Sequence, residues 1–109
     1  MQSADILQRL EQMLESRKGA LASDSYVASL YAKGIDAILK KIGEEAVEAI
    51  IAAKGADRTA VIHEIADLMF HVLVMLKVKN IRFDEVWDEL ARREGLSGLE
   101  EKASRGKPE

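Results

Sequence analysis

Five acidic residues at helical spacing are the strongest candidates for chemistry in this chain. Glu44, Glu45 and Glu48 form one group, and Glu64 and Asp67 form the other. Residues three apart on a helix share a face, so each group directs carboxylates to one side. Two helices packed about 8 to 10 Å apart would bring four or five carboxylates to one pocket. So much negative charge needs cations, and oxygen ligands favour Mg²⁺, with Mn²⁺ as a substitute.

The apolar pattern places both acidic groups on long helices beside the core. The first group lies on a predicted helix from about residue 35 or 36 to residue 54, which Gly55 ends. The second lies on a helix that Asp57 or Thr59 opens, that is apolar nearly all round and that lasts to about residue 79. At about 100° per residue, the first group flanks one apolar stripe. The stripe consists of Ile35, Ile38, Leu39, Ile42 and Ala49.

The remaining pattern predicts an all-α fold. Further helices are expected over residues 3–18, over 26–33 with Asp24 or Ser25 as its cap, and over 84–94 with Asp84 as its cap. The single proline, Pro108, lies near the C-terminus. The whole is expected to form a bundle of four main helices with short extra helices, and the antiparallel pair over 35–79 lies at its centre. Residues from about 96 to 109 are expected to form a flexible tail.

The composition limits the chain to few classes of protein. Its 109 residues make one domain, and the absence of cysteine excludes thiol catalysis, zinc-thiolate sites and disulfides. A net charge of -3 with intermixed signs argues against a nucleic-acid surface. No signal peptide is visible, and charged residues interrupt the longest apolar run, 65–78, so we expect a soluble cytoplasmic protein without a membrane span. The surplus of apolar helix surface predicts a homo-oligomer, with a dimer as the first choice.

Other interpretations of the acidic residues stay open at this point. Lys40 and Lys41 lie four residues before Glu44 and Glu45, so a solvated face closed by lysines explains that group equally well. Glu64 and Asp67 are harder to explain in this way, because burying unpaired carboxylates costs several kcal/mol. A di-iron site is disfavoured, since it would use Glu-x-x-His where this chain has Asp67.

The histidines have two interpretations each. His71 shares the face of Glu64 and Asp67. It is therefore either a hydrogen-bonded core histidine, the favoured interpretation, or a residue that orients a metal ligand. His63 points elsewhere, so we expect it to face solvent or an interface.

These residues carry a resemblance to a known family. The run KIGEEAVEA over 41–49, followed by EIADL over 64–68, resembles the signature of the MazG-like all-α nucleoside triphosphate pyrophosphohydrolases. Within that superfamily the chain is more similar to the phosphoribosyl-ATP pyrophosphatase family of histidine biosynthesis. Three further stretches support this match, and together they extend the resemblance over nearly the whole chain. They are 25–30 with Gly34, 66–74, and 92–105.

The resemblance implies an activity and a site. The family hydrolyses 1-(5-phosphoribosyl)-ATP to 1-(5-phosphoribosyl)-AMP and pyrophosphate, the second step of histidine biosynthesis, with Mg²⁺. Carried over by motif position, the implied metal ligands are Glu45, Glu48, Glu64 and Asp67. Glu44 and Glu45 are the implied catalytic positions, where Glu44 is either a further ligand or the group that orients or deprotonates water.

Basic residues are the candidates for contacts with the phosphates. Lys41 is the first choice, because it lies angularly between Glu45 and Glu48, and Tyr26 is expected to anchor its short helix in the core or to stack on a base. The weaker candidates are Arg17, Lys33, Lys40, Lys102 and Arg105.

Two alternative functions are carried along. One is a house-cleaning pyrophosphohydrolase of the same superfamily that acts on dNTPs or modified nucleotides. A panel of substrates distinguishes this activity from hydrolysis of phosphoribosyl-ATP. The other is a non-catalytic helical adaptor whose acidic patch binds water or a partner. An adaptor gains no thermal stability from Mg²⁺ or Mn²⁺, whereas a pocket crowded with carboxylates does.

Overall fold

The structure is a computed structural model that describes residues 3–94, and these residues form helices and no strand. The all-α fold is therefore confirmed. The predicted tail, with Lys102 and Arg105, lies outside the described residues.

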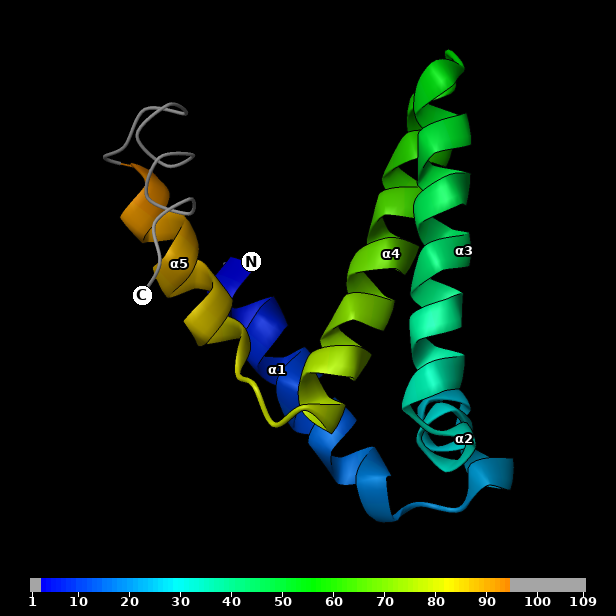
Figure 1. Ribbon diagram of the computed structural model, residues 1–109, viewed down its shortest axis with the longest axis vertical. Coiled ribbons are helices and arrows are strands. Elements are labelled where there is room, and N and C mark those ends of the chain that lie inside the picture. Colours follow the sequence, from blue (N-terminus) through cyan, green and yellow to red (C-terminus); the bar gives the residue numbers. More distant parts are fainter. Residues whose placement is uncertain (1–2, 95–109) are drawn as a thin grey trace, which may run out of the picture.

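The two longest helices form an antiparallel hairpin that carries both acidic groups (Figure 1). They are α3 (Ile35–Lys54) and α4 (Arg58–Val78), and Gly55 and Asp57 lie in the short turn between them. Of the two caps predicted for α4, Asp57 is the one used. Its Oδ1 accepts hydrogen bonds from the backbone N–H groups of Thr59 at 3.0 Å and Ala60 at 3.3 Å. These bonds satisfy N–H groups that the first turn leaves unpaired.

The short helix α2 (Tyr26–Lys33) lies across the lower end of the hairpin and packs against α3. Ser25 caps it by accepting a hydrogen bond from the N–H of Ala28 at 3.2 Å. Gly34, with φ of 94°, ends α2 and leads directly into α3. This left-handed conformation favours glycine, because a β-carbon would be strained there. The turn fixes the direction of α2 relative to the start of the acidic helix.

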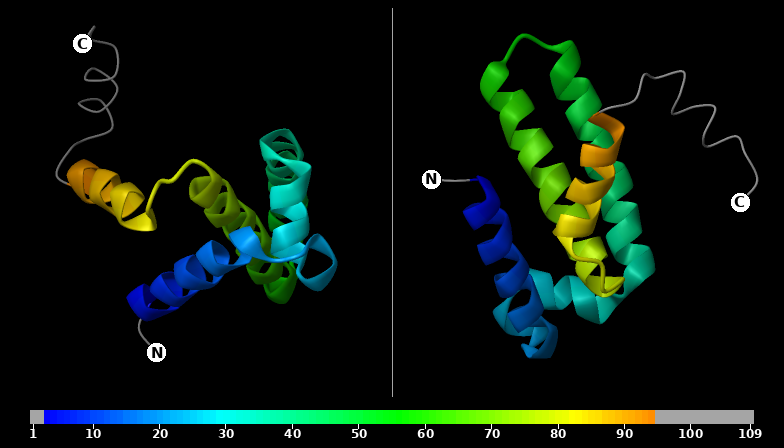
Figure 2. Two further views of the ribbon diagram at one scale, coloured as in Figure 1. Left: turned by 90° about the horizontal axis from the view of Figure 1, so that it is seen from below. Right: turned by 90° about the vertical axis from the view of Figure 1, so that its left-hand side faces the viewer.

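The chain's two outer helices are α1 (Ser3–Ser16) and α5 (Phe83–Glu94). Helix α1 contacts α4 and continues into two 3-10 turns, η1 (Arg17–Gly19) and η2 (Ala22–Asp24). Figure 1 and the left-hand view of Figure 2 place α5 and α3 on opposite sides of α4. Within residues 3–94 the hairpin is thus supported by α1 and α2, and α5 extends away from it.

The predicted cap of α5 is wrong. The helix begins at Phe83, so Asp84 lies inside its first turn. The Glu85 carboxylate accepts a hydrogen bond from the N–H of Arg82 at 2.9 Å, and Glu11 of α1 accepts one from the N–H of Phe83 at 2.8 Å. A carboxylate from a distant helix satisfies this helix end, and spacing along the chain cannot reveal such a contact.

The core is centred on one side chain from each of three helices. Leu14 of α1, Ile38 of α3 and Val74 of α4 are fully buried. The buried residues around them are Val27, Leu30, Leu73, Leu76 and Phe83.

Leu14→Ala is expected to lower the free energy of unfolding by about 2 to 5 kcal/mol, because the substitution leaves a cavity at this central position. Urea unfolding followed by circular dichroism measures the loss. Leu21→Ala is the matched control, since Leu21 is 69% exposed and its truncation should change stability by less than about 0.5 kcal/mol. Equal losses in the two variants would contradict this assignment of the core.

A broad apolar surface remains exposed on the hairpin. Helix α4 is long and apolar enough to cross a membrane by length and composition, and only 22% of that stretch is buried in the fold. It packs against α3 and carries Glu64 and Asp67, and acidic groups are costly inside a membrane. These features favour a core helix with one face left to be covered. The exposed apolar residues of the hairpin are Leu39, Val47, Ile50, Ile51, Ile62, Ile65 and Met69.

Candidate metal and nucleotide site

Three carboxylates from the two hairpin helices converge on one point. Glu45 and Glu48 of α3 and Glu64 of α4 each contribute one oxygen, and these oxygens lie within 4.8 Å of one another. Glu45 is only 4% exposed, Glu64 is partly buried and Glu48 faces solvent. The structure therefore brings the two acidic helix faces together.

Two oxygens in this cluster are buried without a hydrogen-bond partner among the described residues, Glu45 Oε2 and Glu64 Oε2. The other oxygen of Glu45, Oε1, lies 3.2 Å from Lys41 Nζ, which is the contact expected from the alternative of a lysine-closed face. That single ammonium leaves the buried oxygens uncompensated, and uncompensated buried charge is costly. An oxygen-only set of this kind fits a hard divalent cation.

The crowding changes how these groups titrate. The charge of Glu45 raises the pKa of Glu48 above its ordinary value, and hydrogen bonding with Glu64 and desolvation by neighbouring groups raise it further. The hydrogen bond with Glu45 and the negative charge of that residue raise the pKa of Lys41. The cluster thus holds a proton on a carboxylate more tightly than usual and keeps its lysine charged.

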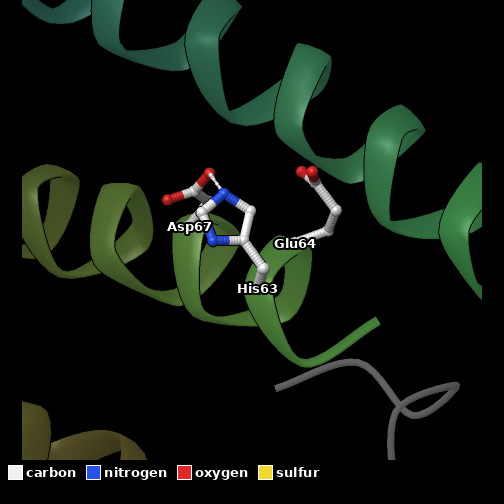
Figure 3. Close-up of side chains that lie close together, drawn as sticks. All are labelled: His63, Glu64 and Asp67. Carbon is white, nitrogen blue, oxygen red and sulfur yellow. Dashed lines mark ion pairs between the residues drawn. The ribbon is translucent and has the colours of Figure 1, made fainter. Parts of the chain in front are cut away.

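Asp67 lies beside the three-carboxylate cluster and has a different neighbour. Its Oδ2 lies 3.3 Å from His63 Nε2, and His63, Glu64 and Asp67 also offer ligand atoms within 4.8 Å of one another. Figure 3 shows the His63 ring next to Asp67, while the Glu64 carboxylate points toward α3. His63 is exposed as expected, but its contact with Asp67 was missed. Their spacing of four residues on a helix was the available clue.

A cavity of about 270 Å³ beside the cluster collects the predicted phosphate-binding lysines. Lys33, Lys40, Lys41 and Glu44 line it together with Tyr26. Glu44 therefore belongs to the wall of the cavity, whereas Glu45 belongs to the carboxylate cluster. Lys41 connects the two, because it lines the cavity and pairs with Glu45.

Tyr26 and His71 join α2 to α4. The Tyr26 hydroxyl lies 2.8 Å from His71 Nε2, and His71 Nδ1 lies 2.7 Å from the backbone carbonyl of Asp67. His71 is 5% exposed, so the interpretation of a hydrogen-bonded core histidine is confirmed. The expectation that Tyr26 is anchored in the core is wrong, because the residue is 51% exposed and its hydroxyl contacts His71. The two residues lie 45 positions apart, and sequence spacing carries no information about such a contact.

Comparisons with known proteins identify the family of this chain. Residues 7–94 match the family model of phosphoribosyl-ATP pyrophosphohydrolase. Proteins named phosphoribosyl-ATP pyrophosphatase are similar along nearly their whole length. The one from Ruthia magnifica is 55% identical over 93% of this chain and 96% of its own. The one from Vesicomyosocius okutanii is 56% identical with the same coverage, and the one from Geobacter metallireducens is 54% identical over 94% of each chain. This chain belongs to the phosphoribosyl-ATP pyrophosphohydrolase family.

Proposed function

We propose that this protein hydrolyses 1-(5-phosphoribosyl)-ATP to 1-(5-phosphoribosyl)-AMP and pyrophosphate in histidine biosynthesis, with Mg²⁺ as its metal and Mn²⁺ as a substitute. Family membership and the names of its relatives support the reaction. The observation that carries the assignment of the site is the pair of buried, unpartnered oxygens of Glu45 and Glu64 next to a lysine-lined cavity. Buried carboxylates without partners are the donors a divalent cation requires.

The residues divide into three roles. Glu45, Glu48 and Glu64 would hold the metal, and Asp67 would join them through its proximity to Glu64. A divalent cation bound there supplies neutralisation of polyphosphate charge and a water of lowered pKa. Lys33 and Lys40 would bind phosphate oxygens in the cavity, where their charge offsets that of the substrate.

Lys41 and Glu44 stand where the cavity meets the cluster. Lys41 holds Glu45 in place by its ion pair and offers further donors to the phosphates. Glu44 lines the cavity without belonging to the cluster, which suits a group that orients or deprotonates the attacking water. Glu45 would act in catalysis through its place in the metal shell.

We propose a homodimer, in the cytoplasm, that covers the exposed apolar face of the hairpin. Val47 and Ile51 of α3 and Ile62 and Met69 of α4 contribute to this face. A concentration of exposed apolar side chains on one hairpin is typical of interfaces between subunits. Sedimentation velocity of the purified chain tests the proposal, and a monomer at micromolar concentration contradicts it.

A substrate panel tests the function. Pyrophosphate release is measured from phosphoribosyl-ATP and from the four dNTPs, each with Mg²⁺ and with excess chelator. The proposed function predicts rapid release from phosphoribosyl-ATP with Mg²⁺ only. Faster release from any dNTP would favour the house-cleaning alternative instead.

Mg²⁺ binding is expected to release a proton at mildly acidic pH. Because the pKa of Glu48 is raised in the folded, metal-free protein, the folded state binds more protons than the unfolded state just above the ordinary carboxyl pKa. The stability of the metal-free protein should therefore fall as the pH rises through the raised pKa, and Mg²⁺ should offset that fall. Calorimetric titrations in two buffers of different ionisation enthalpy measure the released proton. Release that is unchanged in Glu48→Gln would contradict the assignment.

Lys102 and Arg105 are proposed to contribute to substrate binding from outside the described residues. Deleting residues 97–109 is expected to raise KM several-fold while kcat changes little, because each phosphate contact contributes about 1 kcal/mol or more. Steady-state kinetics with phosphoribosyl-ATP measure the change. Unchanged kinetics would show that the tail is dispensable.

A further inference from the structure

The Tyr26–His71 pair lies outside the roles assigned above, although it touches both parts of the site. Tyr26 lines the lysine cavity, and His71 is bonded to the backbone of Asp67. Tyr26 is half exposed and lines the cavity, while its hydroxyl contacts the side chain of the buried His71. A hydroxyl fixed in this way has a defined hydrogen-bonding direction.

The partners of His71 determine where its proton lies. The carbonyl oxygen of Asp67 can only accept, so Nδ1 of His71 must carry the hydrogen of that 2.7 Å bond. A neutral imidazole carries one ring proton, so a proton on Nδ1 leaves only a lone pair on Nε2. The Tyr26 hydroxyl must therefore donate its single proton to His71 across the 2.8 Å contact.

A tyrosine whose proton is committed has only acceptor capacity left. The remaining lone pairs of Tyr26 oxygen can receive a hydrogen bond from a ligand, but they repel a phosphoryl oxygen. The lysines of the same cavity have the opposite property, because an ammonium only donates. The cavity thus has lysine donors for phosphates, and Tyr26 joins Glu44 as an acceptor for a group that carries a proton.

We infer that His71 is a positioning residue that turns Tyr26 into an acceptor for a hydroxyl or amino group of the bound nucleotide, and so makes Tyr26 a specificity determinant. This inference rests on the proposed function for the identity of the nucleotide. It separates recognition of the nucleoside part, by Tyr26, from recognition of the polyphosphate, by the lysines and the carboxylate cluster.

The first test measures the tautomer directly, without substrate or metal. Long-range proton–nitrogen NMR correlations at pH 8 distinguish a ring protonated on Nδ1 from one protonated on Nε2. The chain has two histidines, and exposed His63 is an internal reference. The signals that disappear in His71→Asn belong to His71, and those that remain belong to His63. We expect the Nδ1–H form for His71. The Nε2–H form would overturn the inference, because Tyr26 would then have to accept.

The second test uses kinetics with phosphoribosyl-ATP. Tyr26→Phe is expected to raise KM about 10-fold with kcat within about twofold, because one hydrogen bond to the ligand is lost. The Ki of inorganic pyrophosphate, a probe without hydroxyl-bearing sugar or base, should stay unchanged. Tyr31→Phe is the matched control on the same helix, since the Tyr31 hydroxyl donates to the Leu14 carbonyl at 2.8 Å and does not line the cavity.

Substitutions of His71 test whether the pair acts as a unit. His71→Asn keeps a donor for the Asp67 carbonyl but lacks the acceptor for Tyr26. Its KM should therefore match that of Tyr26→Phe, and the KM of the double variant with both substitutions should be no higher. His71→Gln places an amide oxygen near the position of Nε2 and should restore a KM near that of the wild type.

The outcomes separate this inference from the proposed function. An unchanged KM in Tyr26→Phe would overturn the inference, as would increases in KM that multiply in the double variant. In either case, hydrolysis of phosphoribosyl-ATP by the wild type would still support the proposed function. Should the His71 variants fail to fold by circular dichroism, the comparison of Tyr26→Phe with Tyr31→Phe still decides. A wild-type protein inactive on phosphoribosyl-ATP would instead refute the proposed function, and the NMR result would still decide the geometry.

Discussion

Glu48→Gln is expected to reduce kcat for Mg²⁺-dependent pyrophosphate release by at least about 100-fold, a loss typical of removing one group that stabilises the transition state. Glu48 offers an oxygen within 4.8 Å of those of Glu45 and Glu64, so an amide there removes a full charge from the metal shell. The same substitution should raise the melting temperature of the metal-free protein, because it relieves the repulsion that raises the pKa of Glu48. Lost activity together with gained stability distinguishes a functional carboxylate from a structural one.

Glu89→Gln is the matched control for that experiment. Glu89 lies on α5, and Arg92 and Arg93 lower its pKa to about 2. Removing its charge should leave kcat unchanged and should not raise the melting temperature. Near-normal turnover in Glu48→Gln would exclude Glu48 from the metal shell, and a fall in its stability would show that the cluster is not strained by charge.

Saturating Mg²⁺ or Mn²⁺ is expected to raise the melting temperature by about 10 °C or more. Binding at 100 times Kd stabilises the folded state by about 2.7 kcal/mol, and a domain of this size gains about 4 to 8 °C per kcal/mol. The gain should come from the buried oxygens of Glu45 and Glu64, which have no hydrogen-bond partner in the metal-free fold. Differential scanning fluorimetry with increasing metal measures it.

The control for the metal experiment is the double variant Glu45→Gln, Glu64→Gln, with NaCl at matched ionic strength. The double variant should lose most of the metal response, and NaCl should give little. An equal response in the double variant would place the metal elsewhere. No response in the wild type would favour the non-catalytic adaptor.

The helices could be predicted from sequence because their ends are set locally. Ser25, Gly34, Gly55 and Asp57 act through the backbone of their own turns, so spacing and residue type reveal them. The side of α3 that faces its neighbour was likewise predictable, since an apolar stripe fixes it, whereas α4 is apolar nearly all round and has no such stripe. The end of α5 was not predictable, because Glu11 reaches it from another helix.

The finer structure of the site depends on contacts that no pattern encodes. Tyr26 and His71 come together only because Gly34 turns α2 back across the hairpin. The sequence also did not predict that Glu64 and Asp67 have different neighbours. Asp67 is drawn toward His63, while Glu64 points toward α3. Helical periodicity assigns both to one face and does not resolve which neighbour each one meets.

The hairpin has a consequence for how the protein folds. Both acidic groups lie on α3 and α4, which are joined by a turn of a few residues, so the centre is assembled by closing a short loop at small entropic cost. Local topology of this kind allows early and rapid formation during folding. Electrostatic repulsion between the acidic groups of α3 and α4 therefore opposes closure of the hairpin, one of the first steps of folding. Divalent cations in solution should accelerate this step before any substrate is bound.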